Sequence, residues 1–164
     1  MTLVKQEREN PTIDDFTSQC SPSGEKLLVQ SVKLALRLDH HGLGISAVAT
    51  ALFWEGTIIE TLQEIHIDSS LALKSFLERV LSGQSEDKPD NSLMQDIFSV
   101  ARKESMESGA SKVRAGDILI AIYNSPTLTG KALREALSPG REKGVSFLTQ
   151  LRSAVDQVEK PWTT

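Results

Sequence analysis

The sequence predicts an all-α protein of about eight helices, built as two repeats of four helices each. Apolar residues recur every three or four positions through most of the chain, which is the spacing of a helix face, and no segment of alternating polarity competes. The chain also matches itself after a shift of 70 positions, which brings Leu28 onto Phe98 and VATALF at 48–53 onto ILIAIY at 118–123. ILIAIY alone could also form a strand, but the duplicated pattern favours a helix.

Length, charge and cysteine content exclude several classes of protein to which the chain could belong. The 164 residues suit one domain, and 39% hydrophobic residues suffice for a core. The 18 basic and 22 acidic residues give a net charge of −4 without a basic block, so no nucleic-acid partner is expected. No apolar stretch approaches the roughly 20 residues of a membrane helix, and no signal segment is recognisable, so no membrane partner is expected. Cys20 is the only cysteine, which excludes an internal disulfide and indicates a cytoplasmic protein.

Composition divides the chain into an arm, a domain and a tail. Residues 1–20 are polar and lack periodicity, which predicts a flexible arm, and the charged, turn-rich stretch SGQSEDKPDNS predicts a linker. The expected divisions are an arm at 1–20, a domain at 21–158 (repeat one at 21–82, linker at 83–91, repeat two at 92–158) and a tail at 159–164.

The first helix of repeat one is predicted to begin at Ser21 and Pro22, a capping hydroxyl followed by proline at the first helical position. The turn at Gly42–Gly44 ends it. The short apolar segment at 46–54 then forms a second helix, which Gly56 is expected to close.

Two capping patterns predict the other two helices of repeat one. Thr57 and Glu60 have the spacing of a capping box, in which the hydroxyl and the carboxylate each satisfy a free backbone N–H. Asp68 is expected to cap the fourth helix, whose apolar face runs to residue 81.

Repeat two follows the same plan. Asn91 is predicted to cap a helix that stops near Gly109, and the apolar segment at 116–123 predicts the next helix. Two further helices are expected at 129–137 and 141–158.

Two glycine motifs resemble phosphate loops without meeting their requirements. Gly42-Leu-Gly44 follows a helix instead of a strand and has no third glycine. In SPTLTGKA, Ser125 replaces the first glycine of a P-loop and Ala132 replaces its hydroxyl residue. No nucleotide cofactor is expected from either motif.

Metal and catalytic chemistry are equally disfavoured. His40, His41 and His66 are too few and wrongly spaced for a metal site. They also do not form a recognisable arrangement with a nucleophile, so the chain is predicted not to be an enzyme. Cys20 is predicted to be an unreactive thiol at the edge of the arm, with an intermolecular disulfide under oxidation as the alternative.

The segment LDHHGLGISAVATALFWEG at 38–56 resembles the N-terminal repeats of Clp unfoldases, and IIETLQEIHID at 58–68 resembles the stretch that follows in those repeats. A fainter second match lies at 113–122, and the resemblance covers about 21–155. The residues identical to the family pattern are Leu38, His40, Gly44, Leu52, Glu55, Gly56, Leu62, Glu64, Ile67 and Asp68.

The resemblance implies a Clp-N-like fold, in which two four-helix repeats are related by pseudo-twofold symmetry. It also implies a non-catalytic protein-binding domain that receives an adaptor or substrate peptide, or that contacts the Clp ATPase or protease subunits. Two alternatives remain within that family: a stand-alone accessory factor of a Clp machine, or the substrate-receiving head of a longer unfoldase. An interaction protein that reuses the scaffold for a partner unrelated to proteolysis is a further alternative.

The chain departs from the family pattern at positions that matter for binding. ClpC-type domains carry a glutamate in each repeat that helps to hold phosphorylated arginine, and the matching positions here are Ser46 and Gly116. The following histidine becomes Ala47 and Asp117. Since neither Ser46 nor Gly116 offers a carboxylate for a guanidinium, recognition of phosphoarginine in that mode is not expected.

Trp54 is the most suggestive single residue because it occupies a position where the family commonly has an exposed Arg or Lys. It is either a packed side chain with its indole N–H at the surface or an aromatic anchor for a partner. The sequence therefore predicts a binding surface formed by Phe53, Trp54 and Glu55, together with a groove between the repeats. The residues expected at that groove are Ser46, Gly116 and Asp117.

Overall fold

The computed structural model describes residues 17–37, 44–82, 91–137 and 145–160. These residues form eight named helices and contain no strand, which confirms the all-α prediction. The helices are α3 (Pro22–Arg37), α4 (Ile45–Leu52), α5 (Gly56–Glu64), α6 (Ser69–Leu81), α7 (Asn91–Glu107), α8 (Ala115–Asn124), α9 (Leu128–Leu137) and α10 (Val145–Val158).

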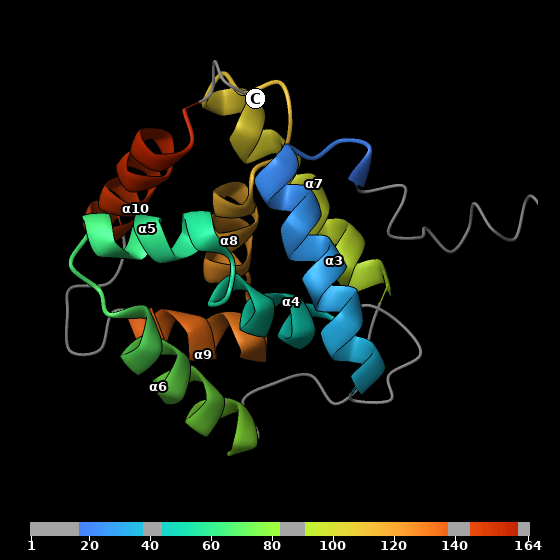
Figure 1. Cartoon of the computed structure of the whole chain (residues 1–164), viewed down its shortest axis with the longest axis vertical. Helices are drawn as coiled ribbons and strands as arrows, with labels where there is room; N and C mark the ends of the chain where they lie inside the picture. The colour runs from blue at the N-terminus through green and yellow to red at the C-terminus, as the bar shows by residue number, and fades with distance from the viewer. Residues whose placement is uncertain (1–16, 38–43, 83–90, 138–144, 161–164) are drawn as a thin grey trace, which may run out of the picture.

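Helix α8 lies at the centre of the bundle, where it contacts α3, α4, α5, α7, α9 and α10 (Figure 1). Every residue from Ala115 to Tyr123 is buried. A helix that is apolar on all sides is stable only when other helices cover all of its faces. ILIAIY is therefore helical despite its strand-like composition, because its neighbours supply an apolar environment all round.

The two halves of the chain pack against each other through paired helices. Helix α3 packs on α4 in the first half, and α7 packs on α8 in the second. Between the halves, α5 lies against α10 and α6 lies against α9 (Figure 1). Neither half forms its core alone, because residues of both belong to one hydrophobic cluster.

The start of α5 differs from the predicted capping box. Helix α5 begins at Gly56, and Glu55 is its N-cap. The Glu55 carboxylate accepts hydrogen bonds from the backbone N–H groups of Thr57 (2.7 Å) and Ile58 (3.1 Å), and from the Thr57 hydroxyl. A carboxylate at this position satisfies two free N–H groups and faces the positive end of the helix dipole. The prediction that Thr57 caps the helix, and that Gly56 closes the preceding one, is therefore wrong.

Other helix ends agree with the sequence. The Asp68 carboxylate accepts from the backbone N–H groups of Ser70 (2.9 Å) and Leu71 (3.2 Å), so Asp68 caps α6 as predicted. Gly109 ends α7 with a φ of +85°, a conformation that glycine adopts without strain.

The predicted boundary between arm and domain is shifted. Val113 donates its N–H to the Gln19 carbonyl (2.8 Å), and its own carbonyl accepts from the N–H of Ser21 (2.8 Å). Cys20, between them, is 4% exposed. Residues 17–20 therefore pack with the domain, whereas the rest of the predicted arm, residues 1–16, lies outside the described residues, as do 83–90 of the linker.

Candidate functional site

Phe53 and Glu55, two of the three residues predicted to form a binding surface at the α4–α5 turn, are both 4% exposed. The ring of Phe53 packs against Phe76 of α6 at a centroid distance of 5.6 Å. The Glu55 carboxylate is occupied by the cap of α5 described above. Both residues hold the turn in place, so the prediction that they contact a partner directly is corrected.

Trp54, between them, is 49% exposed. Its backbone N–H donates to the Ala51 carbonyl (3.0 Å), which continues the last turn of α4. Trp54 is thus covered over about half of its surface, and the exposed half is available to a partner.

The end of α8 and the residue after it show the same order of burial with a different central residue. Tyr123 is 2% exposed and stacks on Phe147 at 5.4 Å, and Ser125 is 6% exposed. Asn124, between them, is exposed. Arg134 donates to the carbonyls of both Tyr123 (2.6 Å) and Ser125 (2.7 Å), which fixes the turn.

The predicted groove at Ser46, Gly116 and Asp117 is not open. Ser46 is half-buried, whereas Gly116 and Asp117 are buried. A Cβ on Gly116 would lie only 2.4 Å from Cγ1 of Val155, so α10 packs directly on α8 at this point. Gly116 is there to allow that close approach, and the prediction that it lines a binding groove is wrong.

Asp117 is paired with Arg114 inside the protein. The Arg114 Nη2 and Nε groups donate to Oδ1 (2.9 Å) and Oδ2 (3.0 Å) of Asp117, and the Arg114 backbone N–H donates to Oδ2 (2.9 Å). The two side chains are 1% and 0% exposed. Burial raises the pKa of the Asp117 carboxyl, while the hydrogen bonds and charge of Arg114 act in the opposite direction. Asp117 is therefore a structural residue and has no carboxylate oxygen facing solvent.

Further polar contacts extend this pair across three helices. Arg114 Nη1 donates to Asp156 Oδ1 (2.8 Å) and to the Glu159 carbonyl (2.9 Å) at the end of α10. The Glu159 carboxylate accepts from the hydroxyls of Ser21 (2.7 Å) and Ser23 at the start of α3. The Ser23 hydroxyl in turn accepts from the backbone N–H at the start of α8 (3.0 Å). These residues form one polar cluster, whose hydrogen bonds connect α3, α8 and α10.

Sequence reasoning missed this polar cluster. The spacing of Arg114 and Asp117, three residues apart at a helix start, is a variant of the capping box and was the available signal. Asp156, Glu159, Ser21 and Ser23 come from distant parts of the chain, so no local pattern connects them.

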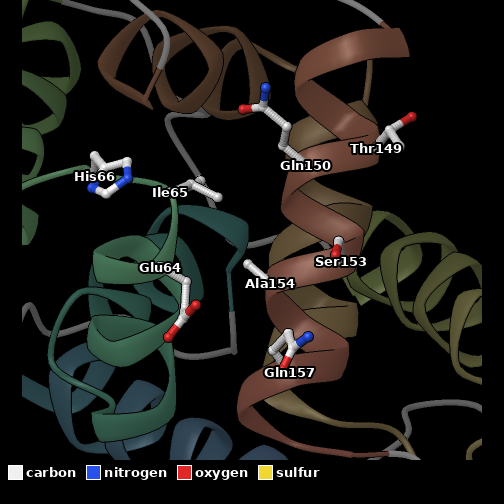
Figure 2. A pocket seen from close by; sticks show the side chains of 8 residues that line it. All are labelled: Glu64, Ile65, His66, Thr149, Gln150, Ser153, Ala154 and Gln157. Atoms are coloured by element: carbon white, nitrogen blue, oxygen red, sulfur yellow. The ribbon is translucent and has the colours of Figure 1, made fainter.

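An open groove of about 700 Å³ does lie between the halves, at a different place from the predicted one (Figure 2). It runs between the end of α5 and one side of α10, with Glu64 and Gln157 toward one end and Gln150 toward the other. The complete lining consists of Glu64, Ile65, His66, Thr149, Gln150, Ser153, Ala154 and Gln157. Its side chains are mostly polar and uncharged, and such residues show no recognisable pattern in a sequence.

The described residues contain no group of three or more His, Cys, Asp or Glu residues that could hold a metal ion. Across the described ranges, no single helix combines the length and the apolar composition that crossing a membrane requires. No protein-family model and no curated protein matches the chain. The resemblance to the Clp N-terminal repeats thus stays a prediction.

Proposed function

We propose that the chain is a non-catalytic, cytoplasmic protein-binding domain of the Clp-N double-repeat type, which recruits an adaptor or a substrate segment to a Clp unfoldase. The observation that carries the proposal is Trp54, a large aromatic side chain that is 49% exposed on a turn whose two neighbours are buried. Tryptophan is among the residues that most often dominate the energy of protein interfaces.

The turn presents the Trp54 indole from a rigid support. Phe53 anchors one side in the core, and the Glu55 cap holds the other side to the start of α5. A side chain whose backbone is already fixed loses less conformational entropy on binding, which favours affinity.

Comparison of the two halves supports a role in binding for Trp54. Positions 53–55 correspond to 123–125 after the shift of 70 positions. In both segments the first and third residues are buried while the central one is exposed, although 53–55 lie between two helices and 123–124 still belong to α8. The second segment keeps this arrangement with Asn124 at its centre. The corresponding position thus holds a polar residue in the second half, and an exposed tryptophan in its place is the residue type enriched in binding hot spots.

The helix contacts support the double-repeat part of the proposal. If the halves are exchanged, the pair α3–α4 corresponds to α7–α8, and the pair α5–α10 corresponds to α9–α6. All four pairs are in contact, as a pseudo-twofold arrangement of two four-helix repeats requires.

The groove between α5 and α10 is a second candidate contact for the same partner. Its glutamine side chains each offer an amide donor and acceptor, which can pair with the peptide groups of an extended segment. Its volume, about 700 Å³, lies within the range of ligand-binding clefts.

The test is capture of partners from native lysate by the tagged chain, compared with Trp54→Asn, which installs the residue of the second segment. Clp ATPase, protease or adaptor subunits are expected among the proteins retained by the wild type and to fall at least tenfold with Trp54→Asn, since anchor residues contribute about 2 kcal/mol or more. Leu128→Asn is the matched control, because Leu128 is 50% exposed. Equal capture by Trp54→Asn and wild type would contradict the proposal, provided that both melt within a few degrees of each other.

A second candidate function is an interaction protein whose partner is unrelated to proteolysis. It is favoured by the absence of a carboxylate at Ser46 and Gly116 and by the burial of the Asp117 carboxylate in its ion pair. Capture of unrelated proteins, with the same loss in Trp54→Asn and no Clp subunits, would select this function.

A further inference from the structure

Helix α3 carries two exposed apolar residues on its outer face. Its inner face is buried through residues that include Leu27 and Leu28, and the helix packs on α4 and α8. On the other side Val29 is 41% exposed and Leu36 is 70% exposed. These two residues are seven positions apart, which places them on the same side of the helix, two turns from each other.

A row of positive charges runs beside these two apolar residues. Lys26, Lys33 and Arg37 are all exposed, and their spacing of seven and four residues places them on one side of the helix. None of the three forms an ion pair with another residue in the ranges that the structure describes. Glu25 is the only acidic residue of α3. This local excess of positive charge contrasts with the net charge of −4 for the chain.

The outer face of α3 also contains a shallow hollow of about 580 Å³, whose lining holds two cations and one carboxylate and consists of Pro22, Glu25, Lys26, Val29, Gln30 and Lys33. The side-chain oxygen of Gln30 is buried and accepts no hydrogen bond from the part of the chain that the structure describes.

The second half of the chain shows that the fold does not require the basic row. The buried Leu27 and Leu28 of α3 correspond, after the shift of 70 positions, to the buried Ile97 and Phe98 of α7. The basic residues do not correspond in the same way, since Lys26 becomes Asp96 and Arg37 becomes Glu107, and only Lys33 keeps its charge, as Lys103. The core face is thus alike in both helices, whereas the basic row belongs to α3 alone.

We propose that the outer face of α3 is a second interaction surface, which binds an amphipathic helix of a partner protein with acidic residues beside its apolar stripe. Val29 and Leu36 are separated by about 10 Å along the helix, the distance between residues seven apart on a facing helix. Lys26, Lys33 and Arg37 would pair with the acidic residues. A second copy of the chain fits this surface less well, because three cations of one copy would meet three cations of the other.

The test uses a fluorescently labelled helical peptide of about 21 residues, three copies of Leu-Glu-Ala-Leu-Glu-Glu-Ala, titrated with the whole chain and followed by anisotropy. The matched control peptide has Lys in place of every Glu. The wild type is expected to bind the acidic peptide at least tenfold more tightly than the basic one. This preference is expected to weaken between about 50 and 500 mM salt, since exposed charges are screened.

Variants of the chain test whether the acidic peptide binds at α3. Lys26→Glu/Lys33→Glu is expected to weaken binding of the acidic peptide at least tenfold, and Val29→Ser/Leu36→Ser is expected to do the same through the apolar contact. Lys74→Glu/Lys131→Glu is the matched control, since both lysines are exposed on other helices and the net charge changes equally. Circular dichroism of each variant checks that it is folded.

Three outcomes would overturn this proposal. These are equal affinity for the acidic and basic peptides, equal loss in the α3 and control lysine variants, and a dimer in solution that the α3 variants abolish, which would make a second copy the occupant. The proposal is independent of Trp54. Trp54→Asn is expected to leave peptide binding unchanged, so failure of one proposal is distinguishable from failure of the other.

Discussion

Replacing Gly116 by alanine distinguishes a packing role for this residue from the open groove that the sequence suggested. The added Cβ would lie 2.4 Å from Cγ1, 2.6 Å from Cγ2 and 3.0 Å from Cβ of Val155. Val155 is 2% exposed, and rotation of its side chain cannot move its own Cβ. Since carbon atoms in contact are ordinarily about 3.5–4.0 Å apart, α8 and α10 have to separate by about 0.5–1 Å.

The expected change in the free energy of unfolding of Gly116→Ala is the sum of two opposing effects. Overpacking of a core costs about 1–3 kcal/mol, whereas alanine is favoured over glycine in a helix by up to about 1 kcal/mol. We therefore expect Gly116→Ala to lower the free energy of unfolding by about 1–2 kcal/mol. For a chain of this size, that change lowers the melting temperature by roughly 2–8 °C.

Urea denaturation followed by circular dichroism measures the effect against a matched control. Gly56, the first residue of α5, has no atom within 4 Å of the position where a Cβ would lie. Gly56→Ala is therefore expected to be neutral or to stabilise by up to about 1 kcal/mol. The double variant Gly116→Ala/Val155→Ala is expected to lose less than the sum of its single variants, because removal of the γ carbons relieves most of the contact.

An unchanged or increased stability of Gly116→Ala, equal to that of Gly56→Ala, would refute this reasoning. It would mean that Gly116 faces open space and that the groove predicted from the sequence is present after all. Additive losses in the double variant would show that the contact with Val155 is not the cause.

Three other predictions concern residues that the structure places in the interior. Arg114→Met leaves the buried Asp117 carboxylate without its charged partner and with only the backbone N–H of residue 114 as a donor. It is therefore expected to cost about 3–5 kcal/mol of unfolding free energy in urea, part of which Arg114→Met/Asp117→Leu recovers; similar losses in the single and double variants would contradict this. Glu55→Ala removes the cap of α5 and is expected to cost about 1 kcal/mol, with Glu55→Gln milder because it keeps an acceptor; equal effects of the two would argue against the cap. Burial raises the pKa of the Cys20 thiol from 9.0 to about 12, which predicts slow reaction with a thiol reagent in the native state. Because the thiol of the unfolded state ionises first, the contribution of Cys20 to stability is present below pH 9 and is lost as the pH rises toward 12. The pH dependence of unfolding in Cys20→Ala should be shallower over that window, and identical slopes would rule out this contribution.

The fold could be predicted because its signals are local. Apolar residues recur every three or four positions along a helix face. Asp68 begins a helix through its side chain, and Gly109 ends one through its backbone conformation. The start of α5 was misplaced by two residues because Glu55 and Thr57 both lie at capping distance, and only the folded geometry selects the carboxylate.

The candidate site was less accessible to sequence reasoning because burial depends on neighbours that are distant in the chain. Phe53 packs against Phe76 and Gly116 packs against Val155, and each pair is far apart in the sequence. No local sequence pattern therefore indicates either contact. Trp54 has no such partner among these contacts, and its position alone left core and interface equally open. The polar groove between α5 and α10 was missed for the same reason, since it exists only where the two halves meet.

The proposed shift of 70 positions between the two halves offers a criterion for telling residues that build the fold from candidates for binding. Where related positions are both buried, as for Leu28 and Phe98, the fold itself accounts for the side chains. Where related positions are both exposed and differ in chemistry, as for Trp54 and Asn124 or Arg37 and Glu107, the fold accounts for neither residue. Both surfaces proposed for binding, the Trp54 turn and the outer face of α3, belong to the first half. The second half supplies α8, which is buried from Ala115 to Tyr123 and contacts α3, α4 and α5, the helices that carry both surfaces.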